Sequence, residues 1–184
     1  LQVNVGTQIT TTQLIASTAI YPAPTVIYTT GFATSGDRRR GEWKQNGVTG
    51  QTASQSPAQL ADGLLNDGLG NQWELVPCIF GPSTASLGAT TDAVNSHLEI
   101  QAGINFCKRL NINLLLVPEG NYRTGAQLTV THTLLIRGGG SSGTAFYSTH
   151  TGNAVVFEPE NAGTGWLYLD GGGIEGINVT RIIS

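Results

Sequence analysis

Short apolar segments recur about every 20 residues through the second half of the chain. One set begins near Leu114, Leu134, Val155 and Ile177, at spacings of 20, 21 and 22 positions. A second set lies between them, near Leu128, Phe146 and Leu167. Turns rich in glycine, serine and asparagine separate the two sets, at 138–143, 151–153, 162–165 and 171–173. Repeats of this length that hold only short strands are typical of a solenoid, and the lack of a helix in each repeat favours a parallel β-helix.

The segment before these repeats has the pattern of an amphipathic helix. Thr91 and Asp92 can cap a helix over 92–109, on which Ile100, Ile104 and Cys107 share one apolar face. The strand 112–117 follows directly. Because the first coil of a parallel β-helix would otherwise expose its core and its unpaired backbone groups, we expect the helix to cap that coil.

The first 86 residues have a different character. The prolines of 21–24 exclude a helix at that point, and we predict that residues 1–30 form an extended arm with little core of its own. Turn signals then separate two strands, 41–44 and 72–76, each centred on a tryptophan, which indicates an aromatic pair across a small sheet. The predicted parts are therefore an arm (1–30), a small β domain (31–86), and a capping helix with the first coils (87–184).

Charged residues make up 11% of the chain and the net charge is −3, which gives no electrostatic reason to bind nucleic acid. No apolar run is long enough to span a membrane, and the N-terminus lacks the basic and apolar regions of a secretion signal. A surface with so few charges fits a β-rich assembly that sister chains partly cover. The chain holds no methionine and stops within a predicted coil, so we expect it to be a piece of a longer protein.

Four segments resemble the opening of the pectate-lyase-like superfamily as it occurs in bacteriophage tailspikes and tail fibres. They are the turn Gly88–Ala93, the helix segment Glu99–Ile104, the coil Leu115–Tyr122 and the strand Leu134–Gly138, in that order. Upstream, 31–37, 41–44 and 71–75 resemble the small β domain that precedes the helix in many tailspikes. The resemblance implies a mainly β fold, with a small N-terminal β domain and a helix-capped, right-handed parallel β-helix of which only the first coils are present.

The same resemblance implies a function. It predicts a homotrimer in the virion tail, assembled in the host cytoplasm, which contacts other phage tail or baseplate proteins through residues 1–86. The later coils would bind host capsule or lipopolysaccharide, and coils downstream could cleave it, whereas this segment itself would be non-catalytic. Two alternatives stay open: a free β-helix polysaccharide lyase or hydrolase, and a tail adaptor without enzymatic activity.

Candidate catalytic acids are few. Glycoside cleavage requires two carboxyl groups, and the acids available in the coils are Glu119, Glu158, Glu160, Asp170 and Glu175. Their positions in turns favour solvated residues, so the catalytic residues are unknown at this point.

Other motifs predict no cofactor or metal site. Gly138–Gly143 has the spacing of a dinucleotide-binding loop, with Glu158 at a suitable distance, but a strand-forming segment follows where a helix would be needed. The histidines, His97, His132 and His150, lack ligand spacing. Arg38–Arg40 fits a solvated hairpin tip or a contact with another virion protein.

Two further motifs have structural interpretations. Cys78 and Cys107 are predicted to be unpaired, largely buried thiols. Asn178–Thr180 matches a glycosylation acceptor but is interpreted as a strand end.

Overall fold

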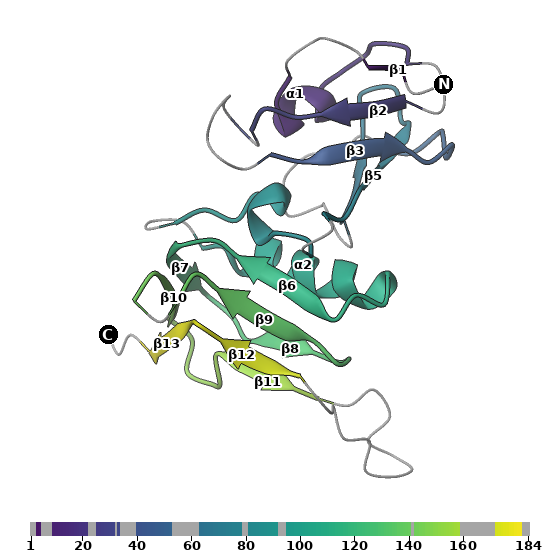
Figure 1. The fold of residues 1–184 in the computed structure, drawn as a ribbon. Helices are drawn as coiled ribbons and strands as arrows, with labels where there is room; N and C mark the ends of the chain where they lie inside the picture. The colour runs from purple at the N-terminus through teal and green to yellow at the C-terminus, as the bar shows by residue number, and fades with distance from the viewer. Residues whose placement is uncertain are drawn as a thin grey trace, which may run out of the picture.

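A computed structural model describes residues 3–4, 9–21, 25–31, 33, 40–52, 63–78, 81–91, 95–140, 142–158 and 172–181. The fold is mainly β, as predicted, and two groups of strands make it up (Figure 1). The first group is a five-stranded sheet in the order β1-β2-β3-β5-β4. Its strands are β1 (Val3–Asn4), β2 (Thr25–Tyr28), β3 (Glu42–Gln45), β4 (Leu64–Asn66) and β5 (Gln72–Leu75), and all pairs except β1–β2 are antiparallel.

Residues from the predicted arm help to build the core of this sheet. Helix α1 (Thr11–Ile15) begins with a capping box at Thr10 and buries Leu14 completely, beside Ile27 of β2 and Trp43 of β3. The expectation of an extended arm with little core is therefore wrong for the described part of residues 1–30. The boundaries at residues 30 and 86 remain a prediction.

The two tryptophans lie in this core, but not as the cross-strand pair that the sequence suggested. The register places Leu75 opposite Trp43 and Gln45 opposite Trp73, so the indoles are offset diagonally. The ring that packs edge-on against Trp73 is that of Tyr21, at 5.4 Å between centroids.

Three parallel sheets form the second group. Their orders are β12-β9-β6, β13-β10-β7 and β11-β8. The strands are β6 (Leu114–Val117), β7 (Gly120–Thr124), β8 (Leu128–Val130), β9 (Leu135–Gly138), β10 (Thr144–Ser148), β11 (Val155–Phe157), β12 (Gly173–Glu175) and β13 (Asn178–Arg181). Alternate residues point into one shared core, which includes Leu115, Leu128, Ile136 and Phe146.

The pairing corrects the two-set periodicity of the sequence. Leu114 pairs with Leu135, but Val155 pairs with Leu128 and Asn178 with Ala145, so the strands fall into three sets. Paired residues lie 21 positions apart in the sequence between β6 and β9, 27 between β8 and β11, and 24 between β7 and β10. Turns of unequal length cause these differences, and they hide the third set in the sequence.

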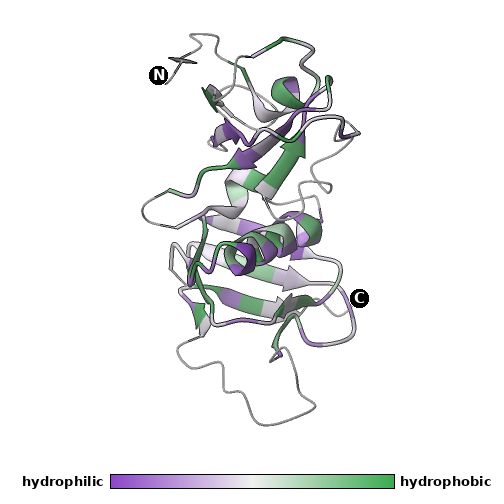
Figure 2. Ribbon diagram, turned by 90° about the vertical axis from the view of Figure 1, so that its right-hand side faces the viewer, coloured by the Kyte–Doolittle hydropathy of each residue, from purple (hydrophilic) through white to green (hydrophobic). Residues whose placement is uncertain are grey.

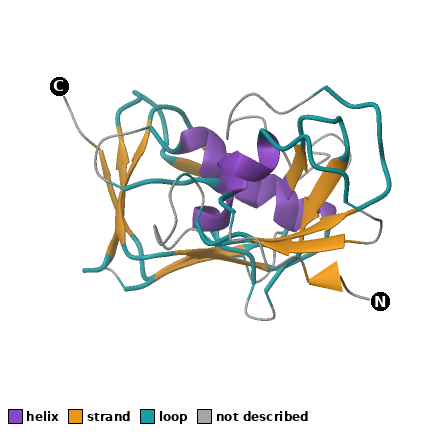
Figure 3. Ribbon diagram, turned by 90° about the horizontal axis from the view of Figure 1, so that it is seen from above, coloured by secondary structure: helices purple, strands orange, loops and turns teal. Residues whose placement is uncertain are grey.

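Helix α2 (His97–Arg109) lies between the two groups of strands, as Figures 1 and 2 show. Seen along the vertical axis, the helices occupy the middle of the molecule (Figure 3). Ile100 and Ile104 are buried in the core of the parallel sheets, whereas Ala102 and Phe106 are buried in the core of the antiparallel sheet. The predicted helix is confirmed from His97 onward, and Asp92 lies outside the described residues.

Segments before and within α2 make hydrogen bonds to the first parallel strands. The Leu116 N–H of β6 donates to the Pro82 carbonyl at 2.9 Å, in the loop that leads to the short 3-10 helix η3 (Thr84–Leu87). The Arg123 carbonyl of β7 accepts from the Ser96 N–H at 2.8 Å. On β8, the Gln101 side chain bonds to both backbone groups of Thr129. Each of the three strands on this side thus has a hydrogen-bond partner outside the parallel sheets.

Candidate functional site

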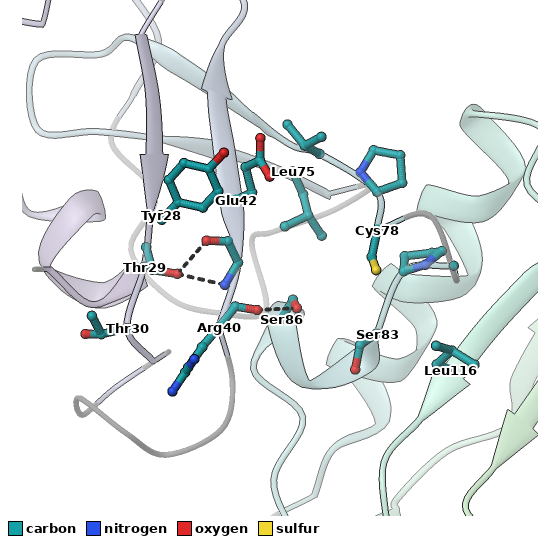
Figure 4. A pocket seen from close by; sticks show the side chains of 15 residues that line it. Tyr28, Thr29, Thr30, Arg40, Glu42, Leu75, Cys78, Ser83, Ser86 and Leu116 are labelled. Carbon is teal, nitrogen blue, oxygen red and sulfur yellow. Dashed lines mark hydrogen bonds between the residues drawn. The ribbon is translucent and has the colours of Figure 1, made fainter. Parts of the chain in front are cut away.

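A groove of about 960 Å³ lies where the antiparallel sheet meets the first parallel strand (Figure 4). Its walls come from segments far apart in the sequence: 28–30, 40–42, 75–78, 81–83, Ser86 and Leu116. A second cavity of about 770 Å³ shares Pro77, Cys78, Gly81 and Leu116 with the first and extends to Arg137 on β9. The two cavities therefore adjoin one another, and the second lies beside β6 and β9.

Hydroxyl groups in this groove are already engaged by the protein backbone. Thr29 Oγ1 accepts from the Gly41 N–H at 2.9 Å and donates to the Gly41 carbonyl at 3.1 Å. Ser86 Oγ donates to the Arg40 carbonyl. The other lining side chains include the partly buried Leu116 and two charged ones, Arg40 and Glu42 (Figure 4). Because Glu42 is the one carboxylate among the described lining residues, the groove suits binding and does not suit paired-carboxylate chemistry.

The described acids of the coils do not assemble a catalytic pair through any observed contact. Glu175 of β12 forms an ion pair with Arg137 of β9 at 2.9 Å. Glu119 lies in the turn after β6, and its side chain lies against Gly139 and Gly143. Glu158 is exposed after β11, in another sheet. Glu160 and Asp170 lie outside the described residues, so the catalytic residues stay unassigned.

The glycine-rich loop is a turn between strands. Strand β10 follows it directly, where a dinucleotide site would require a helix N-terminus. The Gly140 N–H donates to the Gly176 carbonyl at 3.0 Å, and Gly140 has a φ of 116°, which glycine tolerates best. This loop therefore stacks on the turn that precedes β13.

The remaining predicted motifs are scattered. Arg38 and Arg39 lie outside the described residues, and Arg40 lines the groove. Within the described residues, no three His, Cys, Asp or Glu side chains come together as a metal site would require. Burial lowers the pKa of His97, and the proximity of His150 lowers it further. Asn178, in the glycosylation-like motif, is on β13, where its side-chain oxygen accepts from the Thr180 hydroxyl at 3.3 Å.

The two cysteines differ in environment. Both are free thiols; Cys107 is buried, as predicted, but Cys78 is exposed in the groove, so the prediction of two buried thiols is wrong for Cys78. Burial raises the pKa of the Cys107 thiol to about 12, which makes it unreactive.

Gln101 and Asp67 organise the framework of the fold, and neither role was predicted from the sequence. The Gln101 side-chain amide donates to the Thr129 carbonyl and accepts from the Thr129 N–H, both at 2.9 Å. Asp67 is fully buried in the turn between β4 and β5. Its place in an Asn-Asp-Gly turn was the available signal, since Asp side chains there bond to nearby backbone N–H groups.

No helix in the described part of the chain is long and apolar enough to cross a membrane. No protein-family model matches the chain, and no curated protein matches it.

Solved structures provide the comparison. The chain is similar over 97% of its length to a tailspike protein from the Acinetobacter baumannii bacteriophage Fri1, a capsular polysaccharide depolymerase, with a TM-score of 0.70 and 12% identity. It is similar over 98% of its length to the tailspike protein of Acinetobacter phage vB_ApiP_P1, with a TM-score of 0.64 and 13% identity. The match to tailspike protein 2 of Escherichia coli O157:H7 bacteriophage CAB120 covers 95% of the chain, with a TM-score of 0.50 and 14% identity.

The chain covers 32%, 29% and 23% of these three proteins, respectively, and therefore spans less than a third of their length. At these identities the similarity is one of fold alone. The antiparallel sheet, α2 and the parallel sheets together have a fold that is found in part of phage tailspike proteins.

Proposed function

We propose that this chain is the virion-proximal part of a phage tailspike. In this proposal, residues 1–86 attach the spike to other tail or baseplate proteins, and residues 87–184 form the capping helix and the first coils of a right-handed parallel β-helix. Later coils recognise the capsule or lipopolysaccharide of the host, and the native spike is a homotrimer in the virion tail.

The observation that carries the proposal is the similarity of nearly the whole chain, 97% and 98% of it, to two tailspikes with TM-scores of 0.70 and 0.64. An antiparallel sheet, a helix shared between two cores and three parallel sheets occur together in one chain. The covered strand edges near α2 suit the start of a solenoid, whose first coil needs such protection.

Segment 87–184 is proposed to be scaffold and not catalyst. Of the described acids in the coils, Glu175 is held by an ion pair with Arg137. In this proposal, the paired carboxyl groups for any polysaccharide cleavage belong to later coils of the full-length spike.

The test uses the full-length protein and separates attachment from sugar binding. One variant lacks residues 1–86 and also carries Phe106→Ser, because the deletion would expose the Phe106 ring that now packs in the antiparallel core. We expect this variant to be absent from purified virions while it still binds host polysaccharide. The control carries Phe106→Ser alone.

Normal incorporation of the deletion variant into virions would contradict the attachment role. Cleavage of host polysaccharide by residues 1–184 alone, in a reducing-sugar assay, would contradict the scaffold role.

A further inference from the structure

The turn that follows β3 holds an asparagine directly before a glycine. Asn46 and Gly47 are the one Asn-Gly pair in the sequence. Both residues are exposed, and Gly47 has a φ of 85°, a backbone conformation that glycine adopts without strain. An asparagine side chain in such a pair can react with the backbone nitrogen of the next residue, because glycine has no side chain to shield that nitrogen. This turn therefore presents the residue pair that the reaction requires.

The carboxamide of Asn46 is held at both of its polar atoms. Its Oδ1 atom accepts from the Val48 N–H at 3.1 Å, and its Nδ2 atom donates to Gln72 Oε1 at 2.8 Å. The first bond reaches two residues along the chain, so it curls the carboxamide back over the peptide of Gly47. The Val48 N–H also points at the oxygen on which negative charge develops when a nucleophile attacks Cγ, where a fixed donor stabilises that charge. The turn thus orients and polarises the carboxamide.

The Gly47 nitrogen is accessible as the nucleophile. Within the part of the chain that the structure describes, the Gly47 N–H makes no hydrogen bond. A side chain placed on Gly47 would meet no atom within 4 Å, so the space around it is open. Solvent can therefore reach this N–H and remove its proton.

Asn95 has a similar side-chain arrangement but lacks an accessible nucleophile. Its Oδ1 atom accepts from the His97 N–H at 3.1 Å, again two residues along the chain. The intervening residue is Ser96, whose N–H is already donated to the Arg123 carbonyl at 2.8 Å. The two asparagines therefore differ in the availability of the next backbone nitrogen, and only Asn46 has it free.

We propose that Asn46 is a deamidation site, at which a cyclic imide forms with Gly47 and water then opens the imide. The Gly47 nitrogen loses its proton to solvent and bonds to Asn46 Cγ. The bond from Cγ to Nδ2 breaks, and Nδ2 takes up a proton from water and leaves as ammonia. Water then adds to one of the two imide carbonyl carbons, and the bond from that carbon to the nitrogen breaks. Addition at Cγ gives aspartate, and addition at the main-chain carbon gives isoaspartate.

Either product alters the contact between this turn and β5. Each adds a negative charge and removes the donor to Gln72 Oε1. Isoaspartate also lengthens the main chain between two groups that bind Gln72: the Asn46 N–H donates to the Gln72 carbonyl at 3.2 Å, and the Val48 carbonyl accepts from the Gln72 N–H at 2.9 Å. We therefore expect isoaspartate to loosen the turn from the start of β5.

The test follows the full-length folded protein held at pH 8, by peptide mapping with mass spectrometry and by enzymatic methylation of isoaspartate. We expect aspartate and isoaspartate to accumulate in the peptide that contains Asn46 at least ten-fold faster than in the peptide that contains Asn95. The rate at pH 6 should be at least ten-fold lower than at pH 8, because the Gly47 nitrogen must lose its proton before it attacks.

A variant and an unfolded sample complete the test. Asn46→Gln keeps an amide and Gly47 but requires a larger ring, so modification at position 46 should fall at least ten-fold. The wild type in urea keeps the sequence and loses the turn, and we expect Asn46 to react no faster there than in the folded protein. An Asn46 that stays intact while folded and reacts only in urea would overturn the inference, as would equal modification of Asn46 and Asn95.

Discussion

The Trp73 indole N–H donates a hydrogen bond to the Asp67 carboxylate at 3.0 Å, although both side chains are fully buried. The other carboxylate oxygen accepts from the backbone N–H groups of Leu69 and Asn71, each at 2.9 Å. One acid thereby holds the turn between β4 and β5 and fixes the indole in the core. Every observed hydrogen-bond partner of the carboxylate is a donor. An asparagine at this position would place its NH2 group, which is also a donor, opposite one of them.

We therefore expect Asp67→Asn to destabilise the protein, and Asp67→Ala to cost roughly 3 kcal/mol, because buried donors lose their acceptor. Tryptophan fluorescence during urea unfolding measures the change. Asn46→Ala, in the exposed turn after β3, serves as a control and should change stability by less than about 0.5 kcal/mol. Equal stability of Asp67→Asn and the wild type would show that the buried carboxylate is dispensable.

Gln101→Ala should destabilise the cap by about 2 kcal/mol, because Thr129 loses both partners of its backbone groups. Gln101→Glu keeps the acceptor for the Thr129 N–H but faces the Thr129 carbonyl with a second acceptor, so it should not rescue. Asn105→Ala is the control, since it removes only the bond between Gln101 and Asn105. Thermal unfolding and amide exchange at Thr129 would report the difference.

Ile104→Asp should cause misfolding or aggregation. Ile104 is 1% exposed in the core of the parallel sheets, and an unpaired buried carboxylate costs several kcal/mol. Leu98→Asp, on the solvent side of the same helix, should melt like the wild type. If Ile104→Asp also melts like the wild type, α2 does not dock on the first parallel strands.

Glu99→Gln should stabilise the protein at neutral pH. Burial raises the pKa of Glu99, and its Oε2 atom is buried without a hydrogen-bond partner. A carboxyl whose pKa is higher in the folded state favours folding at low pH, and that contribution is lost as the pH rises through the folded-state pKa. The melting temperatures of the variant and the wild type should therefore differ at pH 7 and converge near pH 4.

Cys107 should stay inert in the folded protein. Its pKa is raised to about 12 from 9.0, so the contribution of the thiol to stability is complete below pH 9 and falls as the pH rises toward 12. In a Cys78→Ser variant, we expect a thiol reagent to modify nothing at pH 8 and one thiol after unfolding. Rapid labelling of the folded variant would mean that the core around Cys107 opens readily.

The sequence was sufficient to predict α2 because Ile100, Ile104 and Cys107 repeat with helical spacing. Periodicity identifies buried residues but not the surface that buries them. Phe106, two positions after Ile104 on the same helix, packs in the other core. The two-set repeat failed for a related reason: apolar spacing locates strands, but hydrogen bonds decide which strands are neighbours.

The groove was beyond prediction from the sequence. Its walls combine Tyr28, Leu75 and Leu116, which only the docking of the antiparallel sheet on the parallel strands brings together. The failure of the dinucleotide motif, in contrast, was predictable, because the β-forming residues after Gly143 exclude the required helix.

Helix α2 is built into both cores, and this has a mechanical consequence. Phe106 lies so close to Gly63 that a side chain at position 63 would overlap the ring, and Arg109 binds Glu74 of β5 at 2.6 Å. A force applied to the far end of the parallel sheets is therefore transmitted to the antiparallel sheet through the packed side chains of α2. Substitutions at Gly63 should therefore alter the direction in which the parallel sheets project.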